Sequence, residues 1–117
     1  MFTITKQFHF SAAHSLEGLP TTHPCSRLHG HNYIVEVELQ AAALDAVGFV
    51  RDYGELNKMK AHIDAHLDHK NLNDVLDIQT SAENIAKHLF DVGRKYWPEL
   101  TAVRVSETPK TWAEYRE

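Results

Sequence analysis

The spacing of the apolar residues changes along the chain, and this change is the strongest constraint on the fold. Near both ends of the chain, apolar and polar residues alternate, as they do in strands with one buried face. From Tyr53 to Tyr96 the apolar residues recur every three or four positions instead, which is the period of amphipathic helices. We therefore predict the order strand, strand, helix, helix, strand, strand. The predicted strands cover residues 2–14, 32–43, 101–107 and 111–116.

Two helices are predicted between the strand pairs. Asp52 and Glu55 have the spacing of a capping box at the start of the first helix, and Thr80 and Glu83 repeat that pattern at the second. Pro98 ends the second helix, because proline cannot continue it. The predicted buried stripes are Leu56, Met59, Ile63 and Leu67, then Ile85, Leu89, Val92 and Tyr96, and residues 67–79 join the two helices.

Segregated helices and strands predict an α+β fold, with a four-stranded antiparallel sheet and two helices on one face. A length of 117 residues predicts one domain over residues 1–117. Val35 and Val37 fall on one face of their strand, and Glu36 and Glu38 fall on the other. Because the helices cover only one sheet face, we expect an oligomer.

Composition disfavours several classes of function. The net charge is −4 and no basic face is evident, so nucleic-acid binding is disfavoured. No stretch reaches the length of an apolar membrane span, and Met1–Gln7 lacks the apolar run of a signal peptide. The single cysteine, Cys25, excludes an internal disulfide and fits a reducing compartment. We expect a soluble, cytoplasmic protein.

Histidines are unusually frequent, with nine in the chain. His29 and His31 lie one residue apart, so they share a face if they lie on a strand. The first strand ends at His14, and antiparallel pairing across the loop 15–28 brings His14 beside them. Three imidazoles without a fourth protein ligand are typical of a catalytic zinc.

Three further positions are candidates for chemistry. Cys25 lies close to the histidines, and a metal ion together with Arg27 would favour its thiolate. Asp68 could orient His69. The Glu107 carboxylate could accept two hydrogen bonds from a guanidine-like edge, such as a pterin or guanine has. Simpler roles remain open: a buried small residue for Cys25, a helix end for His69 and a surface position for Glu107.

A competing metal site is possible on the first helix. His62 and His66 are four residues apart on one helix face, and His69 follows. The zinc-protease pattern requires a glutamate directly after the first histidine, but Ile63 stands there. We therefore favour the site at His14, His29 and His31.

These separated motifs occur in an order that resembles the 6-pyruvoyltetrahydropterin synthase superfamily. Within it, the chain is most similar to the bacterial 6-carboxytetrahydropterin synthases of queuosine biosynthesis. The resemblance covers nearly the whole chain. It is carried by Phe10–His14, Cys25–His31, Gly48–Tyr53, Leu67–His69 with Leu72 and Asn73, Thr80–Glu83 and Val105–Thr108.

The resemblance implies a tunnelling fold (T-fold), in which trimers join their sheets into a barrel and two trimers stack into a hexamer. Active sites then lie between subunits. Arg27 and Thr80 are candidates for substrate binding, although a capping box already accounts for Thr80 structurally. The implied roles are zinc ligation by His14, His29 and His31, catalysis by Cys25, Asp68 and His69, and pterin anchoring by Glu107.

The resemblance also implies the reaction. A zinc-dependent lyase would convert 7,8-dihydroneopterin triphosphate to 6-carboxy-5,6,7,8-tetrahydropterin, acetaldehyde and triphosphate. The short interval between Cys25 and His29 is similar to that of the carboxy-forming bacterial enzymes, whereas animal pyruvoyl-forming enzymes have a longer one. The alternatives are a 6-pyruvoyltetrahydropterin synthase, a GTP-hydrolysing relative, and a non-catalytic pterin- or metal-binding module.

Overall fold

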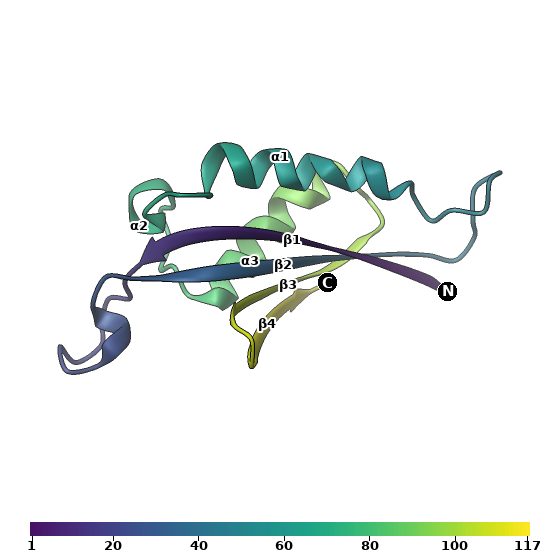
Figure 1. Cartoon of the computed structure of the whole chain (residues 1–117). Coiled ribbons are helices and arrows are strands. Elements are labelled where there is room, and N and C mark those ends of the chain that lie inside the picture. The colour runs from purple at the N-terminus through teal and green to yellow at the C-terminus, as the bar shows by residue number, and fades with distance from the viewer.

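The sheet in the computed structural model of residues 1–117 has four antiparallel strands in the order β1-β2-β3-β4 (Figure 1). Helix α1 runs along β1, and α3 packs against β3 and β4, which confirms the predicted α+β fold with helices on one face. None of the helices is long and apolar enough to cross a membrane. The elements are β1 (Phe2–His14), β2 (His29–Ala41), α1 (Asn57–His66), α2 (Leu72–Val75), α3 (Ala82–Arg94), β3 (Leu100–Thr108) and β4 (Thr111–Arg116), with 3-10 turns at Pro24–Ser26 and Tyr53–Leu56.

The long hairpin of β1 and β2 sets the position of the site. Its register runs from Phe2 opposite Ala41 to His14 opposite His29. Strand β2 therefore begins at His29 rather than at residue 32. It ends at Ala41 rather than at residue 43, because β1 offers no partner beyond Phe2. The rings of Phe10 and Tyr33 stack at 4.7 Å on the buried face of this hairpin.

The first predicted helix starts later than expected. Asp52 caps a 3-10 turn by accepting a hydrogen bond from the Gly54 amide at 2.8 Å, and α1 begins only at Asn57. The short helix α2 was not predicted, because Leu72 is its only buried residue and one residue shows no period. The predicted stripe of Leu56, Met59, Ile63 and Leu67 is confirmed, since all four are fully buried.

The start of α3 differs from the prediction by one residue. Ser81, not Thr80, is the N-cap, and its hydroxyl accepts a hydrogen bond from the Asn84 amide at 3.3 Å. The predicted capping box of Thr80 and Glu83 is therefore wrong. Thr80 instead lies fully buried beneath the start of the helix.

The end of α3 comes earlier than predicted, at Arg94. The chain then turns so that Trp97 packs over Gly93, where an added Cβ would lie 3.2 Å from the indole. The buried face of the helix differs from the predicted stripe. The predicted stripe is right for Ile85 and Leu89, but Val92 is only half-buried and Tyr96 is exposed. The buried residues of α3 are Ile85, Ala86, Leu89, Phe90 and Gly93.

The sheet face that the helices leave uncovered carries a charged network. Glu38 accepts hydrogen bonds from Arg104 at 2.8 Å, from Arg116 at 2.8 and 3.1 Å, and from Thr101 at 2.6 Å. Its side chain is only 8% exposed. The hydrogen bonds from Arg116, together with those from Arg104 and Thr101, lower the pKa of Glu38 to about 2. This network ties β2 to β3 and β4.

Candidate active site

Three histidines meet at one end of the β1–β2 hairpin. His14 ends β1 opposite His29, and His31 follows two residues later on the same face of β2. The ring centroids of the three pairs are 4.7, 5.0 and 4.8 Å apart. One ring nitrogen of each histidine lies within 4.8 Å of those of the other two. The arrangement predicted from strand topology is confirmed.

Backbone carbonyls orient two of these rings. His14 Nδ1 lies 2.7 Å from the Thr80 carbonyl oxygen, and His29 Nδ1 lies 2.7 Å from that of Arg27. A carbonyl oxygen can only accept, so each Nδ1 donates and each Nε2 keeps a free lone pair. The Nε2 atoms of His14 and His31 are buried without a partner. Burial lowers the pKa of both rings, which favours the neutral form that binds metals.

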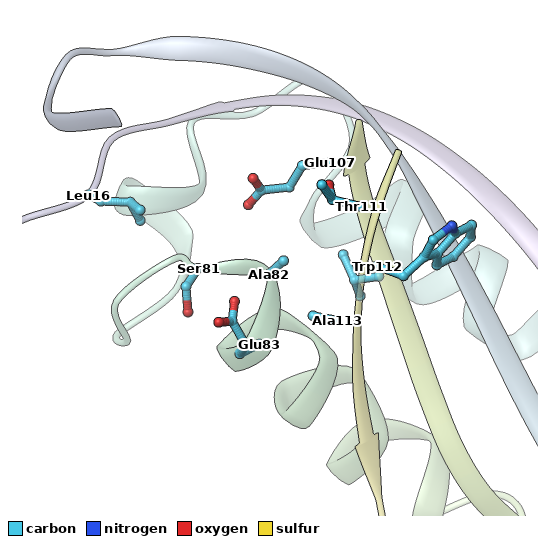
Figure 2. A pocket seen from close by; sticks show the side chains of 9 residues that line it. Leu16, Ser81, Ala82, Glu83, Glu107, Thr111, Trp112 and Ala113 are labelled. Carbon is cyan, nitrogen blue, oxygen red and sulfur yellow. The ribbon is translucent and has the colours of Figure 1, made fainter. Parts of the chain in front are cut away.

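Glu107 lies beside this cluster. It follows Val105 on the helix-covered face of β3, and its Oε2 is 3.7 Å from His31 Nε2, which is too long for a hydrogen bond. Figure 2 shows its carboxylate projecting into the space between Leu16 and the start of α3. The cavity there has a volume of about 420 Å³. Its lining residues include Ser81, Ala82, Glu83, Thr111 and Trp112.

Tyr33 was not predicted to belong to the site. Its ring centroid lies 5.4 Å from that of His31 and 5.9 Å from that of His14, and its buried hydroxyl has no partner. Burial, with a smaller contribution from Glu107, raises the pKa of Tyr33, so the phenol stays protonated. The only sequence signal was its alternation with His29 and His31 along β2.

Asp68 and His69 are in contact, as the candidate acid–base pair requires. Asp68 Oδ2 lies 2.9 Å from His69 Nδ1, and Asp68 Oδ1 accepts a hydrogen bond from the Ser11 amide at 3.0 Å. The Ser11 amide and the His69 ring lower the pKa of Asp68. His69 has a φ of 59°, in the left-handed region, and its amide bonds to the Ser11 carbonyl at 2.7 Å. Such backbone conformations concentrate at functional sites. His69 and His31 line one hollow at the strand ends.

Cys25 lies in the 3-10 turn before β2. Its amide donates to His23 Nδ1 at 3.1 Å, and its carbonyl accepts from the Leu16 amide at 2.7 Å. The thiol is free and partly exposed. The cysteine turn is thus joined to Leu16, a wall of the Glu107 cavity, but the sulfur is not part of the three-ligand group.

The two proposed substrate-binding residues contribute through their backbones. The Arg27 side chain is exposed and makes no hydrogen bond, while its carbonyl orients His29. The Thr80 hydroxyl donates to the Ser15 carbonyl at 3.4 Å, while the Thr80 carbonyl orients His14. Substrate contacts by these two side chains stay predictions.

The competing histidine group has a different third member from the one considered. His62 and His66 on α1 have ring centroids 4.7 Å apart. His69 is directed to Asp68 instead. The ring that completes the group is His88 of α3, 6.0 Å from that of His62.

This antiparallel sheet, with helices on one face and a histidine cluster at its strand ends, defines a protein of the T-fold class. The sequence profile described as 6-pyruvoyl tetrahydropterin synthase matches residues 3–117. The chain belongs to the 6-pyruvoyl tetrahydropterin synthase family, as the sequence motifs predicted.

Individual relatives agree with this assignment. A protein of Archaeoglobus fulgidus, provisionally named 6-carboxy-5,6,7,8-tetrahydropterin synthase, is 37% identical over 107 residues, covering 92% of this chain and 89% of its own. The 6-carboxy-5,6,7,8-tetrahydropterin synthase of Bacillus subtilis is 31% identical over 128 residues, covering 98% and 85%. The structure of Caenorhabditis elegans 6-pyruvoyl tetrahydropterin synthase is 28% identical with a TM-score of 0.87, covering 99% and 95%. The family is enzymatic, which confirms that prediction.

Proposed function

We propose that the protein is a zinc-dependent 6-carboxytetrahydropterin synthase. It would convert 7,8-dihydroneopterin triphosphate and one water molecule to 6-carboxy-5,6,7,8-tetrahydropterin, acetaldehyde and triphosphate, as a cytoplasmic step of queuosine biosynthesis. The observation that carries the proposal is the three-histidine cluster beside Glu107, with His31 Nε2 at 3.7 Å from Glu107 Oε2. The names of the Archaeoglobus and Bacillus relatives support the carboxy product.

His14, His29 and His31 would hold the zinc ion. Two of them have buried, unpartnered Nε2 atoms, and carbonyls fix the tautomers of His14 and His29. Three neutral imidazoles are a donor set suited to a catalytic zinc. When bound, zinc supplies positive charge that stabilises negative charge developing on a substrate oxygen.

Glu107 would bind and orient the pterin. Its carboxylate can accept one hydrogen bond from the pterin amino group and one from the adjacent ring N–H. The cavity of about 420 Å³ between Leu16 and the start of α3 offers room for the ring. Anchoring at this point directs the substrate side chain toward the histidine end of the sheet.

Two groups would move protons. Cys25, as thiolate, would take a proton from the substrate side chain, and His69 would give one back. Asp68 supports this role of His69, because its lowered pKa keeps it ionised against the imidazole. Arg27 is the proposed contact for the triphosphate.

We propose further that residues 1–117 act as one domain within a trimer or a dimer of trimers. The His69 side chain is 83% exposed. An active site enclosed between subunits would remove this exposure and exclude bulk water from the proton-transfer groups.

Mass spectrometry of the products from 7,8-dihydroneopterin triphosphate tests the proposal. We expect 6-carboxytetrahydropterin and acetaldehyde. A pyruvoyl product would support the alternative suggested by the similarity to the Caenorhabditis enzyme. Absence of product would support a non-catalytic binding module. Incubation with GTP alone is the control for a GTP-hydrolysing activity.

A further inference from the structure

A second group of histidines lies between the two long helices and has no part in the proposed reaction. His62 and His66 are one turn apart on α1, and their ring centroids are 4.7 Å apart. The ring of His88 on α3 lies 6.0 Å from that of His62. The corresponding distances in the active-site cluster are 4.7 to 5.0 Å.

The central ring of this group lacks a hydrogen-bond partner. His62 Nε2 is buried and makes no hydrogen bond within the chain. An unsatisfied buried polar atom costs free energy, and so a ligand at this nitrogen is favoured. Burial is also the main cause that lowers the pKa of His62 and of His88. Both rings are therefore neutral near pH 7, with a lone pair available.

We propose that His62, His66 and His88 form a second site for a divalent transition-metal ion, linking α1 to α3. Imidazoles four residues apart on one helix face can share one ion, and the zinc, copper and nickel ions favour such nitrogen ligands. The third ligand comes from the neighbouring helix. Only the active-site cluster brings three ligand atoms within 4.8 Å of one another, so we expect the second site to be the weaker one.

Two charged residues act on this site in opposite directions. The negative charge of Asp91 partly offsets the lowering of the His88 pKa, and the same charge favours a cation at that ring. Lys95 lowers the pKa of both His62 and His88, so its positive charge opposes the ion. Removing the lysine charge would strengthen binding of the ion.

Calorimetric titration of the metal-stripped full-length protein with Zn²⁺ tests the inference. We expect two equivalents per chain, one tight and one weaker. His66 is exposed and His88 half-exposed, so H66Q and H88Q would leave the fold intact. Each would weaken the second equivalent at least tenfold and leave the tight one unchanged. H9Q, which removes an exposed histidine from the face of β1 away from the helices, would keep both equivalents.

Lys95→Gln provides a test in the opposite direction. It would tighten the weaker equivalent roughly twofold, as expected for removing one solvent-screened charge. A single equivalent in the unmodified protein would overturn the inference, and so would two unchanged equivalents in both H66Q and H88Q. Neither result would bear on the active-site cluster, whose tight equivalent is counted separately.

Discussion

At the scale of single residues, backbone carbonyls direct the ring nitrogens of the site histidines. His14 and His29 are oriented by the carbonyls of Thr80 and Arg27, at 2.7 Å in each case. The His14 contact cannot be read from sequence, because Thr80 comes 66 residues after His14 and only the fold joins them. This dependence places the start of α3 among the elements that shape the site.

Removing the Cys25 thiol should strongly slow turnover and leave the rest of the site in place. In Cys25→Ala, we expect kcat to fall by about 100- to 10,000-fold, the usual range for loss of a proton-transfer group. Zinc content should not change, because the sulfur is outside the ligand group. Thr22→Ala, an exposed position in the same loop, is the matched control. Near-normal product formation by the cysteine variant would refute the role of Cys25.

Replacing Glu107 should weaken pterin binding. Glu107→Gln loses a charged acceptor, and hydrogen bonds to charged groups contribute about 1.5–3 kcal/mol. The Kd for the pterin product, measured by calorimetry, should rise about 10- to 100-fold. Glu83→Gln changes a carboxylate on another wall of the same cavity and should alter the Kd less than twofold. The anchoring role is wrong if Glu83→Gln has the larger effect.

At the scale of elements, one feature joins the strands of the sheet and another sets the end of helix α3. The Glu38 network joins β2 to β3 and β4, and the contact of Trp97 with Gly93 determines where α3 ends. Glu38 and Arg116 are far apart in the chain, and Trp97 reaches Gly93 only because the chain turns back after the helix. Local patterns therefore predicted the existence of α3 but not its last turn.

The Glu38 network should make stability depend on pH. The folded pKa of about 2 lies below the ordinary value of 4.5, so the network stabilises the fold above about pH 4.5 and loses this contribution as the pH falls toward 2. Glu38→Gln should cost about 2 kcal/mol in the free energy of unfolding at pH 7. Urea titrations at pH 7 and pH 3 should show that the unmodified protein and the variant differ less in free energy of unfolding at the lower pH. An equal difference at both values would contradict this.

Filling the contact at Gly93 should destabilise the helix packing. An added Cβ would lie 2.9 Å from Leu100 Cδ2 and 3.2 Å from the Trp97 ring. Overpacking costs about 1–3 kcal/mol, but alanine is favoured over glycine by about 1 kcal/mol in a helix interior. We expect Gly93→Ala to lower the free energy of unfolding by about 1 kcal/mol in urea titrations. Gly30→Ala, with its nearest atom at 3.6 Å, should change it by less; the reverse order would contradict the packing.

At the scale of the whole molecule, the sequence was sufficient to predict the order of the strands and long helices along the chain, the helices on one sheet face and the three-histidine cluster. These follow from apolar period and from pairing across one loop, both of which are local. The roles of Tyr33 and His88 were not predictable, because each depends on which rings the finished fold brings beside it. The cap at Ser81 was missed because Thr80 and Ser81 both suit that position, and only burial of Thr80 decides between them.

Both edges of the sheet are open, and we predict that they pair with other copies of the chain. Strands β1 and β4 each have one neighbour, and they carry the exposed side chains of Phe2 and Trp112, at 48% and 46% exposure. Open edges with apolar side chains favour pairing with another copy. Light scattering should give the mass of three or six chains of 13.4 kDa each. A monomeric mass at micromolar concentration would contradict the proposed barrel.

The central claim is that His14, His29 and His31 hold a zinc ion beside Glu107. Anomalous diffraction at the zinc edge, from crystals of the protein as purified, tests it most directly. We expect a peak about 2.0–2.1 Å from one ring nitrogen of each of the three histidines. Absence of a peak there in crystals grown with added zinc, or rings directed apart, would contradict it.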